Sequence, residues 1–167
     1  LVDADFFEIN GKAMLIAVNV ARDIRVWNVE TGQCTNTILR VDPLSYEERT
    51  YYSPRICVSP RNDVAVVTFG SRLFIYSLPG VECIDTFDVD GGPSRCAFSP
   101  TNPDILAFVC KSGNNETNGV LIWDIRQRRL VRKLGKGSGR RPIWFSPDDR
   151  KLLFVSHANR VEVWDIF

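Results

Sequence analysis

The chain has 167 residues, of which 44% are hydrophobic and 25% charged, and this composition indicates a globular domain and excludes a disordered or fibrous chain. Twenty-one lysines and arginines against twenty acidic residues leave a net charge of +1, so no overall field attracts nucleic acid, which is not expected as a partner. The amino terminus lacks an export signal and no stretch approaches eighteen uninterrupted apolar residues, so no membrane span is expected.

In chain order, four units each predict a series of short strands joined by turns. The first begins with FFEINGK, where Asn10 and Gly11 form a hairpin turn, and continues with MLIAVNV, IRVWNV and QCTNTIL. The second reads RICVSP, DVAVVTF, LFIYSL and ECIDTFD. The third reads RCAFSP, ILAFVCK, VLIWDI and RLVRKL, and the fourth PIWFSP, KLLFVSH and VEVWDI. The units occupy about residues 1–39, 40–88, 89–134 and 135–167, the last incomplete.

An aromatic residue ends the third apolar run of every unit. These anchors are Trp27, Tyr76, Trp123 and Trp164, and they are 49, 47 and 41 residues apart. This period is that of one four-stranded propeller blade. Runs such as AVVTF and LLFV are almost continuously apolar, as expected for strands covered on both faces, so similar sheets must stack against one another. The large Trp side chain can fill the gap between sheets, and its ring N–H can find a partner at the sheet edge.

The units resemble WD-repeat β-propeller blades over essentially the whole chain. Two keep the Trp-Asp dipeptide, as Trp123-Asp124 and Trp164-Asp165, whereas the others read Trp27-Asn28 and Tyr76-Ser77. The Gly-His dipeptide of the family is absent, and its turn aspartate is replaced by Ala21, Gly70, Thr117 and Ala158. The resemblance implies an all-β propeller with about four four-stranded antiparallel blades.

Four blades are fewer than the seven or so with which such propellers close. The last unit stops at Phe167, directly after its third strand. We therefore expect part of a larger propeller, seven-bladed or similar, within a larger chain or complex. The alternative is an oligomer in which partial propellers complete one another.

Candidate partner-binding residues lie in the loops that the resemblance places on the top face. The connection at residues 40–55 carries Tyr46, Tyr51 and Tyr52 among charged residues, a combination favoured at interfaces, although the loop could equally pack on its own blade. The turns before the third strands carry Arg22, Arg72 and Arg160, which could surround the channel entrance and bind an acidic peptide or phosphate. Arginine is also common in such turns because it is exposed.

The segment from Arg126 to Arg141 contains eight basic residues and no acid, and its top-face end carries Arg140 and Arg141. If these charges formed one patch, they would attract phosphate, anionic lipid or an acidic partner. The expected topology divides them between the two faces, which favours a solvated outer strand.

Cysteine and histidine content argues against a metal site. The five cysteines include no C-x-x-C pair and the chain has one histidine, so no metal and no cofactor are expected. We expect buried free thiols, which indicate a reducing intracellular compartment, cytoplasmic rather than nuclear. His157 has no evident nucleophile nearby, and the first strands offer only Asp5 and Glu8 as carboxylates. No catalytic residue is identified, and the chain is not expected to be an enzyme.

These observations predict a non-catalytic scaffold that presents top-face loops and its rim to peptides or partner domains. One alternative is phosphate, anionic-lipid or acidic-partner binding through the basic third blade, which makes a membrane surface a minor alternative. A second is a sensor or autoinhibitory propeller of a large NACHT-type signalling ATPase, for which a P-loop domain upstream in the parent sequence would be the decisive observation.

Overall fold

The structure is a computed structural model that describes residues 2–38, 53–89, 92–111, 119–135, 142–156 and 160–166. These residues form fifteen strands in four antiparallel sheets, and none of them is helical. The described part of the chain therefore has no helix long and apolar enough to cross a membrane.

Within each sheet the strands pair in chain order. The first sheet contains β1 (Asp3–Ile9), β2 (Lys12–Val18), β3 (Ile24–Asn28) and β4 (Cys34–Ile38). The second contains β5 (Arg55–Val58), β6 (Val64–Phe69), β7 (Arg72–Ser77) and β8 (Cys83–Asp88). The third contains β9 (Gly92–Phe98), β10 (Ile105–Lys111), β11 (Gly119–Asp124) and β12 (Arg129–Leu134). The fourth contains, among the described residues, β13 (Ile143–Phe145), β14 (Lys151–Val155) and β15 (Val161–Asp165).

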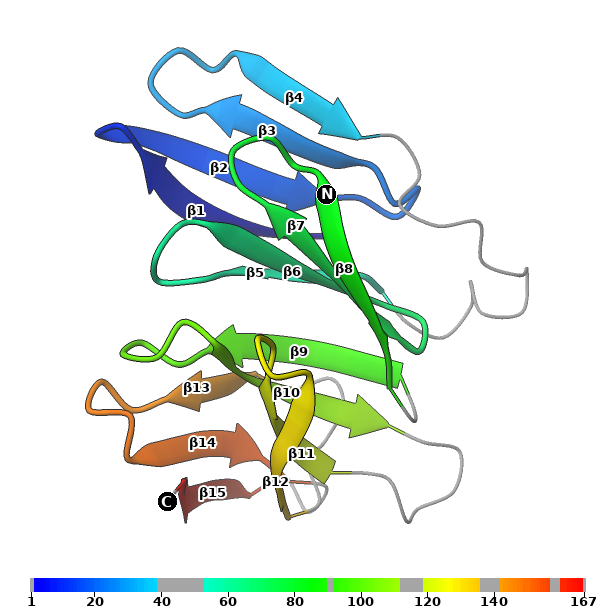
Figure 1. Cartoon of the computed structure of the whole chain (residues 1–167), viewed down its shortest axis with the longest axis vertical. Coiled ribbons are helices and arrows are strands. Elements are labelled where there is room, and N and C mark those ends of the chain that lie inside the picture. Colours follow the sequence, from blue (N-terminus) through cyan, green and yellow to red (C-terminus); the bar gives the residue numbers. More distant parts are fainter. Residues whose placement is uncertain are drawn as a thin grey trace.

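The four sheets follow one another in chain order (Figure 1). Their first strands lie innermost and contact each other in sequence, β1 against β5, β5 against β9 and β9 against β13. Meander sheets whose first strands converge in this way are the blades of a β-propeller. The predicted all-β propeller fold is confirmed.

The core is divided into three apolar clusters, one between each pair of neighbouring sheets. The first joins sheets one and two, the second joins sheets two and three, and the third joins sheets three and four. The sequence of strand β10 is continuously apolar because both faces of the strand are buried. Leu106 and Phe108 enter the second cluster, whereas Ala107 and Val109 on the opposite face enter the third.

The repeated Ser-Pro landmarks close the hairpins between first and second strands. The N–H groups of Ser59, Ser99 and Ser146 donate to the carbonyls of Val64, Ile105 and Lys151 at 2.9, 2.9 and 2.8 Å. The serine hydroxyls add local bonds, such as that from Ser59 Oγ to Asp63 Oδ1 at 2.5 Å. Short polar side chains that bond to nearby groups in this way favour turns over continued strands.

In each of the first three sheets, the turn between the third and fourth strands contains one residue in the left-handed backbone conformation. Gly32 fills this position in the first sheet with φ of 68°, Val81 in the second with φ of 56° and Arg128 in the third with φ of 54°. A β-branched residue rarely adopts this conformation. Val81 is held there because its side chain is 3% exposed and belongs to the first apolar cluster.

Two of the aromatic anchors, Tyr76 and Trp123, pack against the preceding sheet. Trp123 lies against the second cluster, with its ring centroid 6.1 Å from that of Phe87. The Nε1 of Trp123 is buried without a hydrogen-bond partner among the described residues. Trp164 Nε1, in contrast, donates to Glu162 Oε2 at 2.9 Å.

The aspartate of the Trp-Asp dipeptide caps the following turn. Asp124 Oδ1 accepts the N–H of Gln127 at 2.8 Å, and Asn28 Oδ1 accepts the N–H of Thr31 at 2.9 Å in the equivalent turn of the first sheet. Asp124 is 9% exposed. Asp165, in the second Trp-Asp dipeptide, instead pairs on the surface with Lys151 Nζ at 2.8 Å.

We predict unequal effects when the two aspartates are replaced. Asp124→Ala removes a buried acceptor from the Gln127 N–H and should lower the free energy of unfolding by about 1–3 kcal/mol. Asp165→Ala, the matched control, should change stability little because the pair is solvent-exposed. Urea unfolding followed by tryptophan fluorescence measures both, and equal losses would contradict the capping role of Asp124.

Candidate binding site

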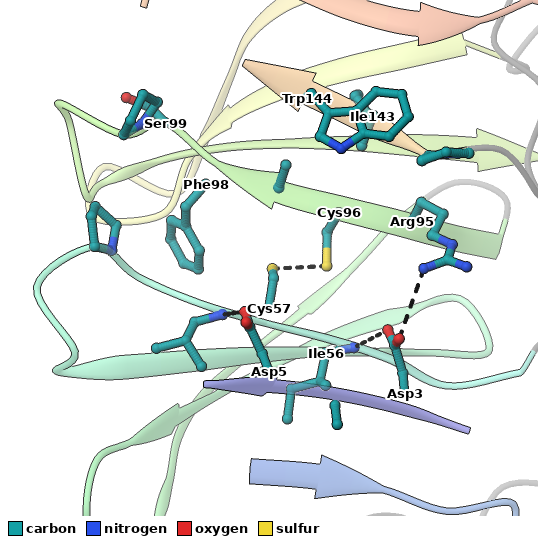
Figure 2. Close-up of a pocket in the computed structure, with 16 residues that line it drawn as sticks. Asp3, Asp5, Ile56, Cys57, Arg95, Cys96, Phe98, Ser99, Ile143 and Trp144 are labelled. Atoms are coloured by element: carbon teal, nitrogen blue, oxygen red, sulfur yellow. Dashed lines mark hydrogen bonds and ion pairs between the residues drawn. The ribbon is translucent and has the colours of Figure 1, made fainter. Parts of the chain in front are cut away.

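A hollow of about 440 Å³ opens along the inner strands (Figure 2). Its lining comes from β1, β5, β9 and β13 and from the prolines beside them. Because the strands pair antiparallel, the beginnings of these four inner strands lie at the same end of the sheets as the turns between second and third strands. This end corresponds to the top face expected from the sequence.

Two carboxylates of β1 bind the edge of β5. Asp3 Oδ2 accepts the N–H of Ile56 at 3.1 Å, and Asp5 Oδ2 accepts the N–H of Val58 at 2.8 Å. These N–H groups face away from β6 at the inner edge of the second sheet, where no strand of the described residues pairs with β5. Side-chain carboxylates of β1 thus accept the edge N–H groups of β5 in place of a β-ladder between the two inner strands.

Burial costs the Asp5 carboxylate part of its hydration. Desolvation raises the pKa of Asp5, and the N–H groups of Val58 and Phe6 oppose that rise without cancelling it. The negative charge of Asp3 raises the pKa further.

Two guanidinium groups converge on Asp3 from different sheets. Arg55 Nη1 lies 3.9 Å and Arg95 Nη1 3.8 Å from Asp3 Oδ1. Arg95 belongs to the third sheet, so its side chain crosses the inner edge of the second sheet to reach β1 (Figure 2). The distance of 3.8 Å exceeds a hydrogen bond, and Arg95 Nε is buried without a partner among the described residues. The Arg95 side chain is nevertheless 37% exposed and lines the hollow, so the outer part of its guanidinium is accessible there.

Thiols and an indole complete the lining. Cys57 of β5 and Cys96 of β9 approach within 2.8 Å, sulfur to sulfur. Burial, followed by the hydrogen bond to Cys96, raises the pKa of the Cys57 thiol well above its usual range. Trp144 of β13 lies on the opposite side of the hollow and is 54% exposed (Figure 2).

The arginines predicted from sequence to surround the channel have different surroundings. Arg22 is 6% exposed and stacks over the Phe69 ring of the next sheet, 4.3 Å from its centroid. Arg72 pairs with Asp88 of the outer strand at 2.8 Å. Arg160 is exposed at the start of β15, and its carbonyl accepts the N–H of Ser156. Arg22 thus stabilises a sheet interface, and Arg160 presents its charge to solvent.

Other predicted site residues lie outside the described part of the chain, namely Tyr46, Tyr51, Tyr52, Arg140 and Arg141. Two described basic residues of the run from Arg126 to Arg141 have partners on neighbouring sheets. Arg128 pairs with Asp85 at 2.5 Å, and Arg132 donates to the carbonyls of Asp165 and Ile166 at 3.1 and 2.9 Å.

The expectation that all the thiols are buried is wrong. Cys57 and Cys110 are buried and Cys96 is half-buried, but Cys34 and Cys83 are exposed because they lie on the outer strands β4 and β8. No disulfide joins any of these five described residues. Within the described ranges, no three His, Cys, Asp or Glu side chains form a group that could hold a metal ion.

Sequence reasoning identified Asp5 as an inner-strand carboxylate but missed Asp3, Arg95, Trp144 and the thiol pair. The position of these residues within the repeated Ser-Pro landmarks could have indicated most of them. Arg95 and Cys96 begin the RCAFSP landmark, and Trp144 lies in the middle of PIWFSP. Equivalent landmark positions in successive blades converge at the channel, which makes them candidates as a set.

Replacement of Asp5 tests the balance between its hydrogen bond and its buried charge. Asp5→Asn keeps an oxygen for the Val58 N–H but removes the charge, so at pH 7 it should be at least as stable as the wild type. Asp5→Ala loses the acceptor and should be less stable than either. Urea midpoints measured from pH 3 to pH 8 check both variants.

The raised pKa of Asp5 determines how the stability difference between the wild type and Asp5→Asn should change with pH. A pKa raised in the folded state means that folding disfavours ionised Asp5, so the wild type loses stability relative to Asp5→Asn as pH rises through the folded pKa. Below about pH 4 the carboxyl is protonated in both states and the difference should disappear. An Asn variant as unstable as the Ala variant at pH 7 would contradict this account.

No protein-family model matches the chain. Known proteins similar to it include the target of rapamycin complex subunit wat1 of Schizosaccharomyces pombe, 21% identical over 157 residues, and nuclear distribution protein PAC1 of Coccidioides posadasii, 26% identical over 166 residues. The similarity covers 92% of this chain in both cases but 45% of wat1 and 34% of PAC1, so the chain spans less than half the length of these relatives. Both are WD-repeat proteins. Together with the four repeated sheets and their converging inner strands, these similarities support the resemblance to WD-repeat β-propellers.

Proposed function

We propose that the chain is a non-catalytic protein-interaction scaffold that binds a peptide segment of a partner at the top-face end of the inner-strand hollow. The observation that carries the proposal is the Arg95 guanidinium, whose side chain is 37% exposed and lies 3.8 Å from Asp3 Oδ1, in a hollow also lined by exposed Trp144. Arginine and tryptophan are the residue types that most often supply binding energy at interfaces.

The chemistry of the hollow favours a segment with one acidic and one apolar side chain. A carboxylate of the partner can accept from Arg95, whose nearest described carboxylate oxygen, on Asp3, is at 3.8 Å. The face of the Trp144 indole offers an apolar surface for the second side chain. Asp3 and Asp5 on the opposite wall disfavour a segment that is acidic throughout.

Two further observations support a scaffold. The relatives are WD-repeat proteins, a group of typically non-catalytic scaffolds, and wat1 is by name a subunit of a complex. We accordingly propose protein partners in an intracellular complex, with the rim and top-face loops as additional contact surfaces. The acidic-partner, anionic-lipid and NACHT-type alternatives stay predictions.

Peptide selection tests the proposal. Random peptides displayed on phage would be selected on the immobilised chain, and synthetic versions of the enriched sequences measured by fluorescence anisotropy. Arg95→Gln and Trp144→Ala should each weaken binding by roughly tenfold or more, because each removes an anchor at the centre of the site. Arg150→Gln is the matched control, since its side chain is 82% exposed on a hairpin turn away from the hollow.

Binding unaffected by both hollow variants would overturn the proposed site. If that binding were instead lost on adding salt and on Arg129→Gln, the basic third blade would be the binding surface.

A further inference from the structure

The inner strands of the second and third sheets bring two thiols into contact. Cys57 lies on β5 and Cys96 on β9, 39 residues apart in sequence, and the Cys57 S–H donates to Cys96 Sγ at 2.8 Å (Figure 2). The other three cysteines have different environments. Cys34 and Cys83 are exposed on outer strands with sulfur contacts to their own strands, and Cys110 is buried on β10.

The sulfur atoms are already close to bonding distance. A disulfide bond is 2.03–2.05 Å long, so the two atoms must approach by about 0.8 Å more. Strands β5 and β9 belong to different sheets and share no backbone ladder. The approach can therefore occur by small side-chain rotations and a slight shift between sheets, without breaking the β5–β6 or β9–β10 hydrogen bonds.

A β-bulge next to Cys96 orients this part of β9. The register shifts between Phe108, opposite Cys96, and Cys110, opposite Pro93, so β9 contains an extra residue between Pro93 and Cys96. Bulges of this kind redirect side chains at the edge of a sheet. Here the side chains of Arg95 and Cys96 both line the hollow.

The hollow gives small molecules a route to one of the two thiols. Cys96 is half-buried and lines the hollow, whereas Cys57 is 6% exposed and lies in the second apolar cluster. The raised pKa of Cys57 keeps that thiol protonated, which leaves Cys96 as the sulfur that an oxidant reaches first.

We propose that Cys57 and Cys96 form a reversible disulfide that links the inner strands of the second and third sheets when a peroxide enters the hollow. This proposal is independent of the peptide-binding function.

The reaction proceeds in two steps. Cys96 sulfur attacks a peroxide oxygen, the O–O bond breaks, and a sulfenic acid and one molecule of water result when the peroxide is hydrogen peroxide. Cys57 sulfur then attacks Cys96 sulfur, the S–O bond breaks, and the Cys57 proton leaves with the hydroxyl as a second water. The two thiols lose two electrons to the peroxide, and a dithiol reductant reverses the change.

The test is disulfide mapping of the unmodified chain. The chain, dilute and freed of reductant, is treated with hydrogen peroxide, alkylated and digested with trypsin. Cleavage after Arg55, Arg61, Arg95 and Lys111 gives the peptides ICVSPR and CAFSPTNPDILAFVCK. Because the second peptide also contains Cys110, fragmentation in the mass spectrometer must locate the bond. The expected product joins these peptides through Cys57 and Cys96, has lost two hydrogens and disappears with dithiothreitol.

Variants and stability add independent measurements. Cys57→Ala should stop the reaction at the sulfenic acid of Cys96, detected with dimedone, whereas Cys83→Ala, an exposed control, should leave the disulfide unchanged. Oxidation should raise the urea midpoint of the wild type and not that of Cys96→Ala, because the cross-link restricts the unfolded chain.

Two results would overturn the proposal, and neither requires a variant to fold. In the first, Cys57 and Cys96 remain fully alkylated after peroxide has oxidised the exposed Cys34 and Cys83. In the second, Cys96 proceeds to the sulfinic acid with no linked peptide.

Discussion

Burial of both faces of the central strands is the interaction on which the rest of the structure depends. Strands β6 and β10 direct alternate side chains into the clusters on either side, so each sheet is held by its neighbours rather than by a core of its own. Apolar burial of this kind provides most of the stability of a stacked-sheet protein. Polar links between sheets, such as that of Arg61 with Asp104 at 3.1 Å, lie at the margins of these clusters and set orientation more than stability.

The same packing gives the inner strands their special character. Sheets that pack face to face around an axis cannot also join edge to edge, so the inner edge of β5 is bound by the carboxylates of Asp3 and Asp5 instead of by a strand. Contacts through side chains hold β1 and β5 farther apart than a β-ladder would, and they leave space between the inner strands. The hollow, the converging guanidinium groups and the thiol contact all occupy this space.

The two proposals concern adjacent residues. Arg95 and Cys96 are consecutive on β9, beside its bulge, and both line the hollow, so the two proposals concern one short strand.

The sequence by itself determined the repeat, the strand order within each unit and the sheet stacking, because alternation, turn residues and period are local properties that each blade repeats. It also predicted Asp124 and Trp123 as structural anchors. Only the tertiary structure decided that Asp3 meets Arg95, that Cys57 meets Cys96 and that Cys34 is exposed. These contacts depend on the angle at which successive sheets pack, and no periodicity within one blade records that angle.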